Sequence, residues 1–337
     1  MAFQVLTLSG GGFLGLYSAT VLAELEKTTG RSVASSFDLI AGTSIGGIVA
    51  LGLAAGAPAS RIKSVFETNG ARIFGNRPPP TSSLGVFKDI VRCAFTSKYE
   101  TSALRETIES IVGKDTRIGD LHHAVLIPSI NLSKGSPQIF KTPHHVDFRL
   151  DLNLRVVDVA LATSAAPTYF PLAEIGDSLF ADGGLYANSP DLLALHEATH
   201  FFKVDEGSVR ILSIGTTTAQ FSFGHTQTKS FGIAHWFSGQ RLMNVIIASQ
   251  QKSVDFMLRH RLADRYVRLD AIQSKEQERI LGLDVATEEA QKTIRALASA
   301  TVQENINNPV LQEMLTNKAE ATKFHHNDLP PIPWTPG

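Results

Sequence analysis

Short apolar segments that end abruptly in glycine-rich turns mark the first part of the chain. The segment 3–8 has the length and composition of a strand, and so does the segment 37–41. Ser9-Gly10-Gly11-Gly12 follows the first segment, and Gly42-Thr43-Ser44-Ile45-Gly46-Gly47 follows the second. A helix is predicted after each turn, and Gly30 is placed to end the first one. A strand, a tight glycine turn and a helix, repeated, predict an α/β fold with a mainly parallel sheet.

The same kinds of element continue along the rest of the chain. Further strands are predicted at 124–130, 179–181, 209–215 and 266–269. Further helices are predicted at 154–163, 191–202, 241–262 and 287–306. Three consecutive prolines indicate a surface loop at 76–85. Because no repeat or shift in composition marks a second domain, we expect one domain over 1–323 (a core at 1–215 and a helical part at 216–323), followed by a flexible proline-rich tail at 324–337.

Composition narrows the class of protein. Hydrophobic residues make up 43% of the chain and charged residues 19%, which is enough for a large core and too little charge for disorder. A net charge of -1 gives no reason to expect binding to DNA or RNA. Cys93 is the single cysteine, so no intrachain disulfide can form. The N-terminus lacks a basic region before its apolar run, and the longest uncharged segment, 45–57, is shorter than the ~20 residues that span a bilayer. We therefore expect a cytoplasmic protein that reaches any membrane from solution.

The turn at Ser44 is a candidate nucleophile. Gly42-Thr43-Ser44-Ile45-Gly46 matches the G-x-S-x-G elbow, in which a tight strand-to-helix turn exposes the serine hydroxyl over the N-terminus of the next helix. Free N–H groups and the helix dipole favour negative charge there. A glycine turn with a capping serine would fit the same pattern. The strand before it and the apolar helix after it are the context that the elbow requires, and they favour the nucleophile.

The glycine loop 10–15 fits two kinds of site. Gly10, Gly12 and Gly15 match G-x-G-x-x-G, which predicts a nucleotide-binding oxidoreductase. That fingerprint needs an acidic residue at the end of the second strand, whereas Asp38 lies at its start. The other interpretation is an oxyanion hole, in which backbone N–H groups of the loop stabilise the transition state by about 3 kcal/mol per donor. If the first two strands are neighbours, this loop and Ser44 emerge side by side.

The base that activates a serine is harder to find from the sequence. An ordinary hydrolase of this type would use a downstream acid and a histidine. Candidates include His196, His200, His225, His235 and His260, but none lies between glycines as catalytic residues in turns often do. No His or Cys spacing resembles a zinc site, so neither a metal nor another cofactor is expected.

Asp182 is the alternative partner for the serine. It follows the predicted strand 179–181 and precedes Gly183 and Gly184. Two glycines after a carboxylate allow the backbone to fold back, so that the side chain can point into a cleft. Taken alone, Asp-Gly-Gly is also a common structural turn.

Four separated motifs together resemble the patatin-like phospholipases. These are Gly10-Gly11-Gly12-Phe13-Leu14-Gly15, Gly42-Thr43-Ser44-Ile45-Gly46, Asp182-Gly183-Gly184 and the segment 164–171 before it. The resemblance implies a three-layer α/β/α fold and a Ser44–Asp182 dyad without histidine. It also implies an oxyanion hole from Gly10, Gly11, Gly12 and Ile45, with Gly15, Gly42, Gly46, Gly183 and Gly184 supporting the turns. The implied reaction is hydrolysis of acyl esters of membrane glycerophospholipids. The family usually has Arg or Lys where this chain has Leu14, so electrostatic help from that side chain is in doubt.

The short architecture also resembles bacterial patatin-like effectors of anti-phage defence that a cyclic nucleotide activates. This resemblance implies a cyclic di- or oligonucleotide as activator, activity at the inner face of the cell membrane, and room for a homo-oligomer. The activator would bind partly in the C-terminal part, where basic residues occur at Arg241, Lys252, Arg259, Arg261 and Arg265. A solvated helix face explains the same charges. A catalytically inactive lipid-binding scaffold on this fold also stays open.

Overall fold

The computed structural model describes residues 2–75, 97–217, 236 and 241–326. Within these ranges the centre of the fold is an eight-stranded sheet with the order β5-β6-β3-β2-β1-β7-β8, and β4 pairs with β3 beside this path. The strands are β1 Phe3–Leu8, β2 Leu39–Gly42, β3 Ala124–Asn131, β4 Ser136–Lys141, β5 Ala173–Ile175, β6 Ser178–Asp182, β7 Val209–Ile214 and β8 Tyr266–Leu269.

The strands that carry the glycine turns are central and parallel. β1 pairs in parallel with β2 on one side and with β7 on the other, and β2–β3 and β7–β8 are also parallel. The register aligns Leu8 with Gly42, so the chain leaves β1 and β2 at the same level of the sheet. The first two strands are thus neighbours, which is the condition for the glycine loop and Ser44 to emerge side by side. β4, β5 and β6 pair antiparallel at one side, and this brings the end of β6 alongside β3.

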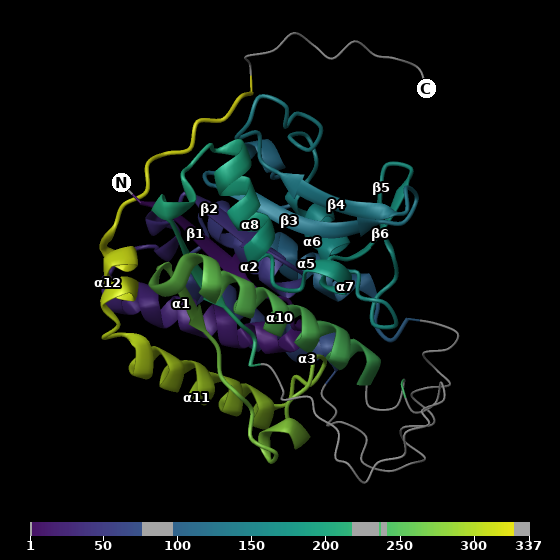
Figure 1. Ribbon diagram of the computed structural model, residues 1–337. Coiled ribbons are helices and arrows are strands. Elements are labelled where there is room, and N and C mark those ends of the chain that lie inside the picture. The colour runs from purple at the N-terminus through teal and green to yellow at the C-terminus, as the bar shows by residue number, and fades with distance from the viewer. Residues whose placement is uncertain (1, 76–96, 218–235, 237–240, 327–337) are drawn as a thin grey trace.

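Helices cover both faces of the sheet (Figure 1). They are α1 Gly15–Thr29, α2 Ile45–Ala54, α3 Ala59–Phe74, α5 Thr101–Val112, α6 Val156–Thr163, α7 Gly184–Ala187, α8 Asp191–His196, α10 Arg241–Leu262, α11 Glu288–Asn305 and α12 Pro309–Thr316. None of the helices in the described ranges is long and apolar enough to cross a bilayer.

Alternate side chains of the central strands divide the core in two, as the period of a strand requires. Leu6 and Ile40 join the larger cluster, which α1, α2, α3, α5, α6 and α11 cover. Val5 and Leu39 join the smaller cluster, which packs under α8 and α10. Since both faces of β1 and β2 are buried, these strands are apolar almost throughout. The three-layer α/β/α fold with a mainly parallel sheet is confirmed.

Several predicted elements coincide with the structure, and others shift or are new. The segments 3–8, 266–269 and 241–262 are β1, β8 and α10 with the predicted bounds. The strand predicted at 37–41 begins two residues later, at Leu39. The helix predicted at 191–202 is two elements, α8 and a π-helical turn Glu197–Phe201. The elements β4, β5, α3, α5 and α12 were not predicted. The loop 76–85, Cys93 and tail residues 327–337 lie outside the described residues.

Candidate active site

Ser44 occupies the turn between β2 and α2. Its φ of 56° is positive, an uncommon conformation for a residue with a side chain and the one that a nucleophile elbow requires. The turn can be this tight because Gly46 passes the end of β1 closely: a Cβ there would lie 2.4 Å from the carbonyl oxygen of Leu8. The Ser44 N–H donates to Thr163 Oγ1 at 3.0 Å, so the elbow is also held from α6.

Asp182 reaches this serine from the end of β6. Ser44 Oγ donates a hydrogen bond of 2.6 Å to Asp182 Oδ2. The other carboxylate oxygen accepts the N–H of Gly184 at 2.7 Å, so the backbone folds back onto the side chain within the Asp-Gly-Gly turn. The structure thus brings together two residues 138 positions apart in the chain. Both residues are nearly buried, at 9% and 5% exposure.

Burial changes the acidity of this carboxyl group. It raises the pKa of Asp182 from 3.8 to about 6, against the opposing effect of the hydrogen bonds from Ser44 and Gly184. A carboxylate with a pKa near 6 is a stronger base than an ordinary aspartate and is still ionised at neutral pH.

The glycine loop lies beside the elbow, and its N–H groups differ in their partners. Gly10 donates its N–H to the carbonyl of Asn188 at 3.0 Å, so the expectation that Gly10 supplies an oxyanion donor is wrong. The N–H groups of Gly11, Gly12 and Ile45 donate to no acceptor within the described part of the chain. Free amides beside a serine hydroxyl are the arrangement that can stabilise an oxyanion.

The path of the loop is fixed by contacts on both sides. Gly12 has a φ of 55°, and a Cβ there would lie 2.1 Å from the Leu283 carbonyl oxygen, which in turn accepts the Phe13 N–H at 2.7 Å. The other turn glycines also pass close to their neighbours. A Cβ would lie against the Ile45 side chain at Gly15, against Gly46 at Gly42, against Pro128 at Gly183, and against Asn188 and Asp182 at Gly184. Leu14 is uncharged, and its side chain packs in the core.

Three supporting residues were missed in the sequence. Thr163 holds the Ser44 amide, and Asn188 and Thr216 both donate to the Gly10 carbonyl, at 3.3 Å and 2.9 Å. Asn188 and Thr216 each lie within a few residues of a predicted strand or turn. Neither residue belongs to a motif, so only the folded chain reveals what they contact.

No histidine in the described ranges hydrogen-bonds to Ser44 or Asp182. His144 does link a hydroxyl and a carboxylate, with Nδ1 2.8 Å from Thr142 Oγ1 and Nε2 2.9 Å from Glu197 Oε1. Thr142 is completely buried and also accepts a backbone N–H of β3, so this group stabilises the fold and is closed to a substrate. His225 and His235 lie outside the described residues.

The oxidoreductase interpretation finds little support at this loop. Asp38 lies just before β2, at the end of this strand opposite to Ser44, where its carboxylate accepts the Gln4 N–H at 2.7 Å. It therefore cannot hold a ribose at the glycine loop. No group of three His, Cys, Asp or Glu side chains suited to a metal occurs in the described ranges.

Known proteins resemble this chain over most of its length. A family model described as patatin-like phospholipase matches residues 6–195. A protein of Pseudomonas aeruginosa (strain BWHPSA011 / Pa011), named cGAMP-activated phospholipase, is 43% identical over 98% of this chain and 97% of its own. This chain belongs to the patatin-like phospholipase family. A protein of the same name from Vibrio cholerae serotype O1 is 40% identical over 79% of this chain and 81% of its own. Among solved structures, VipD from Legionella pneumophila has a TM-score of 0.40 at 13% identity, covering 89% of this chain and 67% of its own.

Membership of the family confirms the resemblance drawn from the four motifs. The protein is an enzyme of the lipid acyl hydrolase type, a carboxylic ester hydrolase. The matched range 6–195 includes the glycine loop, the elbow and the Asp-Gly-Gly turn.

Proposed function

We propose that the protein hydrolyses acyl esters of membrane glycerophospholipids with Ser44 as nucleophile and Asp182 as the side chain that exchanges its proton. The observation that carries this proposal is the hydrogen bond of 2.6 Å from Ser44 Oγ to Asp182 Oδ2 at a strained elbow. The N–H groups of Gly11, Gly12 and Ile45, which donate to no acceptor in the described part of the chain, lie at the same end of the sheet, just beyond the carboxyl ends of β1 and β2.

The first half of the reaction forms an acyl-enzyme. Asp182 accepts the hydroxyl proton as Ser44 Oγ bonds to the ester carbonyl carbon, and the carbonyl oxygen becomes an oxyanion. The N–H groups of Gly11, Gly12 and Ile45 stabilise that negative charge. When the C–O bond of the ester breaks, Asp182 returns the proton to the lysophospholipid alkoxide, which leaves as an alcohol.

The second half releases the fatty acid. The same carboxylate takes a proton from a water molecule as that water attacks the acyl carbon, and the proton then passes to Ser44 Oγ as the acyl bond breaks. Each step uses only this pair, water and backbone amides.

The acidity of Asp182 predicts how the rate depends on pH. Because the carboxylate must be ionised to accept a proton and burial raises its pKa to about 6, kcat/KM is expected to rise with pH around 6 and to level off above 7. Asp151 provides a matched control, since burial also raises its pKa to about 6 while it bonds the Lys141 N–H elsewhere. Asp151→Asn should leave the profile unchanged. A profile with no titration between pH 4 and pH 8 would contradict the assignment.

We further propose that a cyclic di- or oligonucleotide activates the enzyme, and that it acts in anti-phage defence from the cytoplasm at the inner face of the cell membrane. The relatives from Pseudomonas aeruginosa and Vibrio cholerae, both named cGAMP-activated phospholipase, support this. A structural route for regulation supports it as well. Gln250 on α10 donates to the carbonyl of Leu185 at 3.1 Å and accepts the Asn188 N–H at 3.1 Å, so α10 is bonded to α7, the short helix that follows Asp182.

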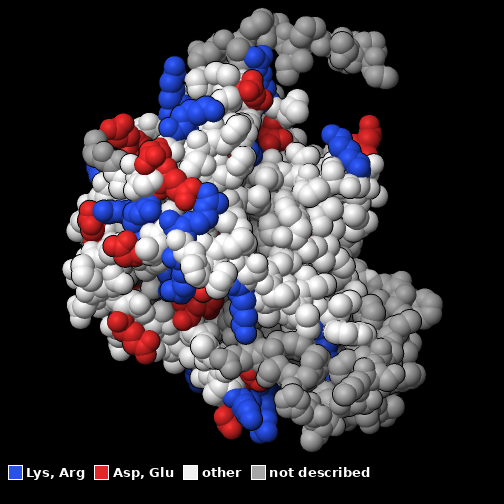
Figure 2. All heavy atoms as spheres, in the orientation of Figure 1, with Lys and Arg blue, Asp and Glu red and all other residues white. Residues whose placement is uncertain are grey.

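The basic residues in and just after α10 do not indicate where a nucleotide would bind. Arg259 pairs with Asp255 and Arg261 with Glu206, which favours a solvated helix face for both. Arg265 donates to two backbone carbonyls. In Figure 2, Lys and Arg side chains are intermixed with Asp and Glu side chains on the left of the face, and the described residues on its right carry few charges. Among the described residues of that face, no one-signed field marks a nucleotide site.

Hydrolysis of a phospholipid panel by the full chain, with and without cGAMP, tests both parts. We expect release of free fatty acid from glycerophospholipid vesicles, none from the Ser44→Ala variant, and an increase in rate when cGAMP is added. Equal rates with and without cGAMP would contradict the activation while leaving the hydrolase. No release under either condition would contradict the hydrolase itself, and a catalytically inactive scaffold would then be the better interpretation.

A further inference from the structure

Thr216 lies against the glycine loop where the loop passes Ser44. Its side chain is buried, and its hydroxyl donates a hydrogen bond of 2.9 Å to the Gly10 carbonyl. A Cβ on Gly11 would lie 2.3 Å from the same hydroxyl oxygen and 2.7 Å from the Thr216 Cβ. Thr216 therefore contacts the loop at two consecutive residues, and only glycine at position 11 leaves room for this approach.

A second donor reaches the same carbonyl. Asn188 Nδ2 lies 3.3 Å from the Gly10 oxygen, and the Gly10 N–H donates to the Asn188 carbonyl at 3.0 Å. Because a peptide unit is planar, donors that fix the Gly10 C=O also fix the N–H of Gly11, which points in the opposite direction. That N–H is one of the donors proposed for the oxyanion.

The backbone beside Thr216 is itself held in an unfavourable conformation. Thr217 has a φ of 59°, a region that residues with a side chain seldom adopt unless their surroundings hold them there. Asp270 Oδ1 accepts the Thr217 N–H at 3.0 Å, and Gln273 Nε2 donates to the Thr217 hydroxyl at 2.9 Å. The strain is thus maintained directly next to the residue that contacts the loop.

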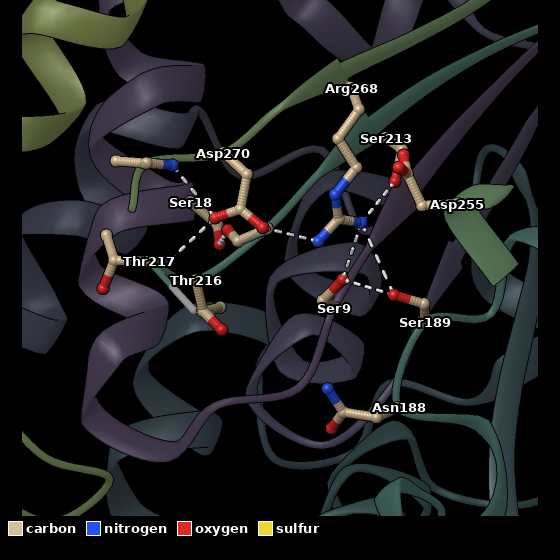
Figure 3. A network of polar contacts seen from close by, with 12 residues as sticks. Ser9, Ser18, Asn188, Ser189, Ser213, Thr216, Thr217, Asp255, Arg268 and Asp270 are labelled. Atoms are coloured by element: carbon tan, nitrogen blue, oxygen red, sulfur yellow. Dashed lines mark hydrogen bonds and ion pairs between the residues drawn. The ribbon is translucent and has the colours of Figure 1, made fainter. Parts of the chain in front are cut away.

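A buried arginine connects this turn with the glycine loop (Figure 3). Arg268 Nη2 pairs with Asp270 Oδ2 at 2.6 Å. Its Nη1 lies near three hydroxyls, at 2.9 Å from Ser213, 3.3 Å from Ser9 and 3.4 Å from Ser189. Ser9 directly precedes the glycine loop, and Ser189 directly follows the asparagine that bonds to it. One guanidinium therefore contacts the start of the glycine loop, the segment that carries Asn188, and Asp270, which holds the turn after Thr216.

We propose that Thr216 is a positioning residue of the oxyanion hole: its hydroxyl sets the plane of the Gly10–Gly11 peptide and thereby the direction of the Gly11 N–H, with Arg268 and Asp270 holding Thr216 in place. This role rests on the proposed hydrolase function and adds the group that orients one of its donors. It acts through the loop, so it affects the transition state, in which the oxyanion exists, more than the bound ester.

Two substitutions at position 216 separate orientation from packing. Thr216→Val keeps the shape and removes the hydroxyl, whereas Thr216→Ser keeps the hydroxyl and removes a methyl group. Hydrolysis of a soluble p-nitrophenyl ester in the presence of cGAMP gives kcat and KM without a membrane. We expect kcat of Thr216→Val to fall about 10- to 100-fold with KM changed less than about twofold, because a small misplacement costs this much. Thr216→Ser should recover most of that loss.

Inhibitor affinity gives a readout that a general loss of structure would not mimic. A trifluoromethyl ketone forms a tetrahedral oxyanion on a nucleophilic serine, whereas an ether analogue of the substrate forms none. In Thr216→Val, affinity for the ketone should fall by the same factor as kcat/KM, while affinity for the ether stays unchanged.

Thr107→Val is the matched control. Thr107 is also a buried threonine whose hydroxyl donates to a backbone carbonyl, that of Ala103 at 2.7 Å, but it lies in α5. It should keep wild-type kcat. Unchanged kcat in Thr216→Val, equal losses in the valine and serine variants, or parallel losses of ketone and ether affinity would overturn the proposed role. If the wild-type chain hydrolyses neither this ester nor phospholipid vesicles, the hydrolase function itself fails, and the role of Thr216 fails with it.

Discussion

Ser44→Ala is expected to lower kcat for ester hydrolysis by about 10⁴-fold or more, because no acyl-enzyme can form without the hydroxyl. The measurement is release of fatty acid from phospholipid vesicles under conditions in which the wild-type chain is active. The alanine keeps the backbone of the elbow, whose φ of 56° is imposed by the neighbouring glycine contacts, so circular dichroism should be unchanged.

A second serine provides the control that tests whether the loss of activity is specific to position 44. Ser110 lies in α5, and its hydroxyl donates to the Thr107 carbonyl at 2.7 Å, away from the elbow. Ser110→Ala should retain wild-type activity. Substantial hydrolysis by Ser44→Ala would mean that another residue is the nucleophile.

Asp182→Asn is expected to lower kcat by about 10³- to 10⁴-fold with almost no change in side-chain volume, because an amide cannot accept the serine proton. Hydrolysis of the soluble ester at pH 7.5 measures this directly. Asp151→Asn, which neutralises another buried aspartate with a raised pKa, should keep full activity. If Asp182→Asn keeps most of its activity, a different base, such as a histidine, must act in its place.

The same variant should be more stable than the wild type at neutral pH, which separates loss of chemistry from loss of fold. The pKa of Asp182 is about 6 in the folded chain, against 3.8 for an unperturbed aspartate. Well below pH 4 the group is neutral in both states, whereas between about pH 4 and pH 6 it is ionised in the unfolded chain and still largely protonated in the folded one. Its contribution to the free energy of unfolding therefore falls across this window and is constant above about pH 7. The free energy of unfolding of Asp182→Asn relative to wild type should therefore increase by about 2 kcal/mol from pH 4 to pH 7. Urea denaturation at the two pH values tests this.

The parts of the fold that depend on local sequence were predictable. A strand, a glycine turn and a helix are each set by neighbouring residues, so β1, the elbow and α10 could be placed without coordinates. The pairing of Ser44 with Asp182 was inferred from family motifs, because their spacing in the sequence does not determine their distance in space.

The elements that were missed have weak local signals or depend on distant partners. α3 contains Gly70, which lowers helix propensity, yet Phe13 packs where a Cβ at that position would lie. β5 has only three residues and exists because β6 pairs with it. Gly10 was predicted to be an oxyanion donor because it belongs to the glycine loop, but its N–H donates to the Asn188 carbonyl. Such contacts join segments far apart in the chain, so no motif reveals them.

Covalent labelling with a fluorophosphonate, followed by mass spectrometry of the peptides, tests the Ser44–Asp182 pair most directly. At pH 7.5 we expect a single adduct on Ser44 in the wild-type chain and a strongly reduced labelling rate in Asp182→Asn, because the carboxylate that accepts the hydrogen bond of 2.6 Å is the base that activates the hydroxyl. Labelling of Ser44 at equal rates in both proteins, or an adduct on a different residue, would contradict it.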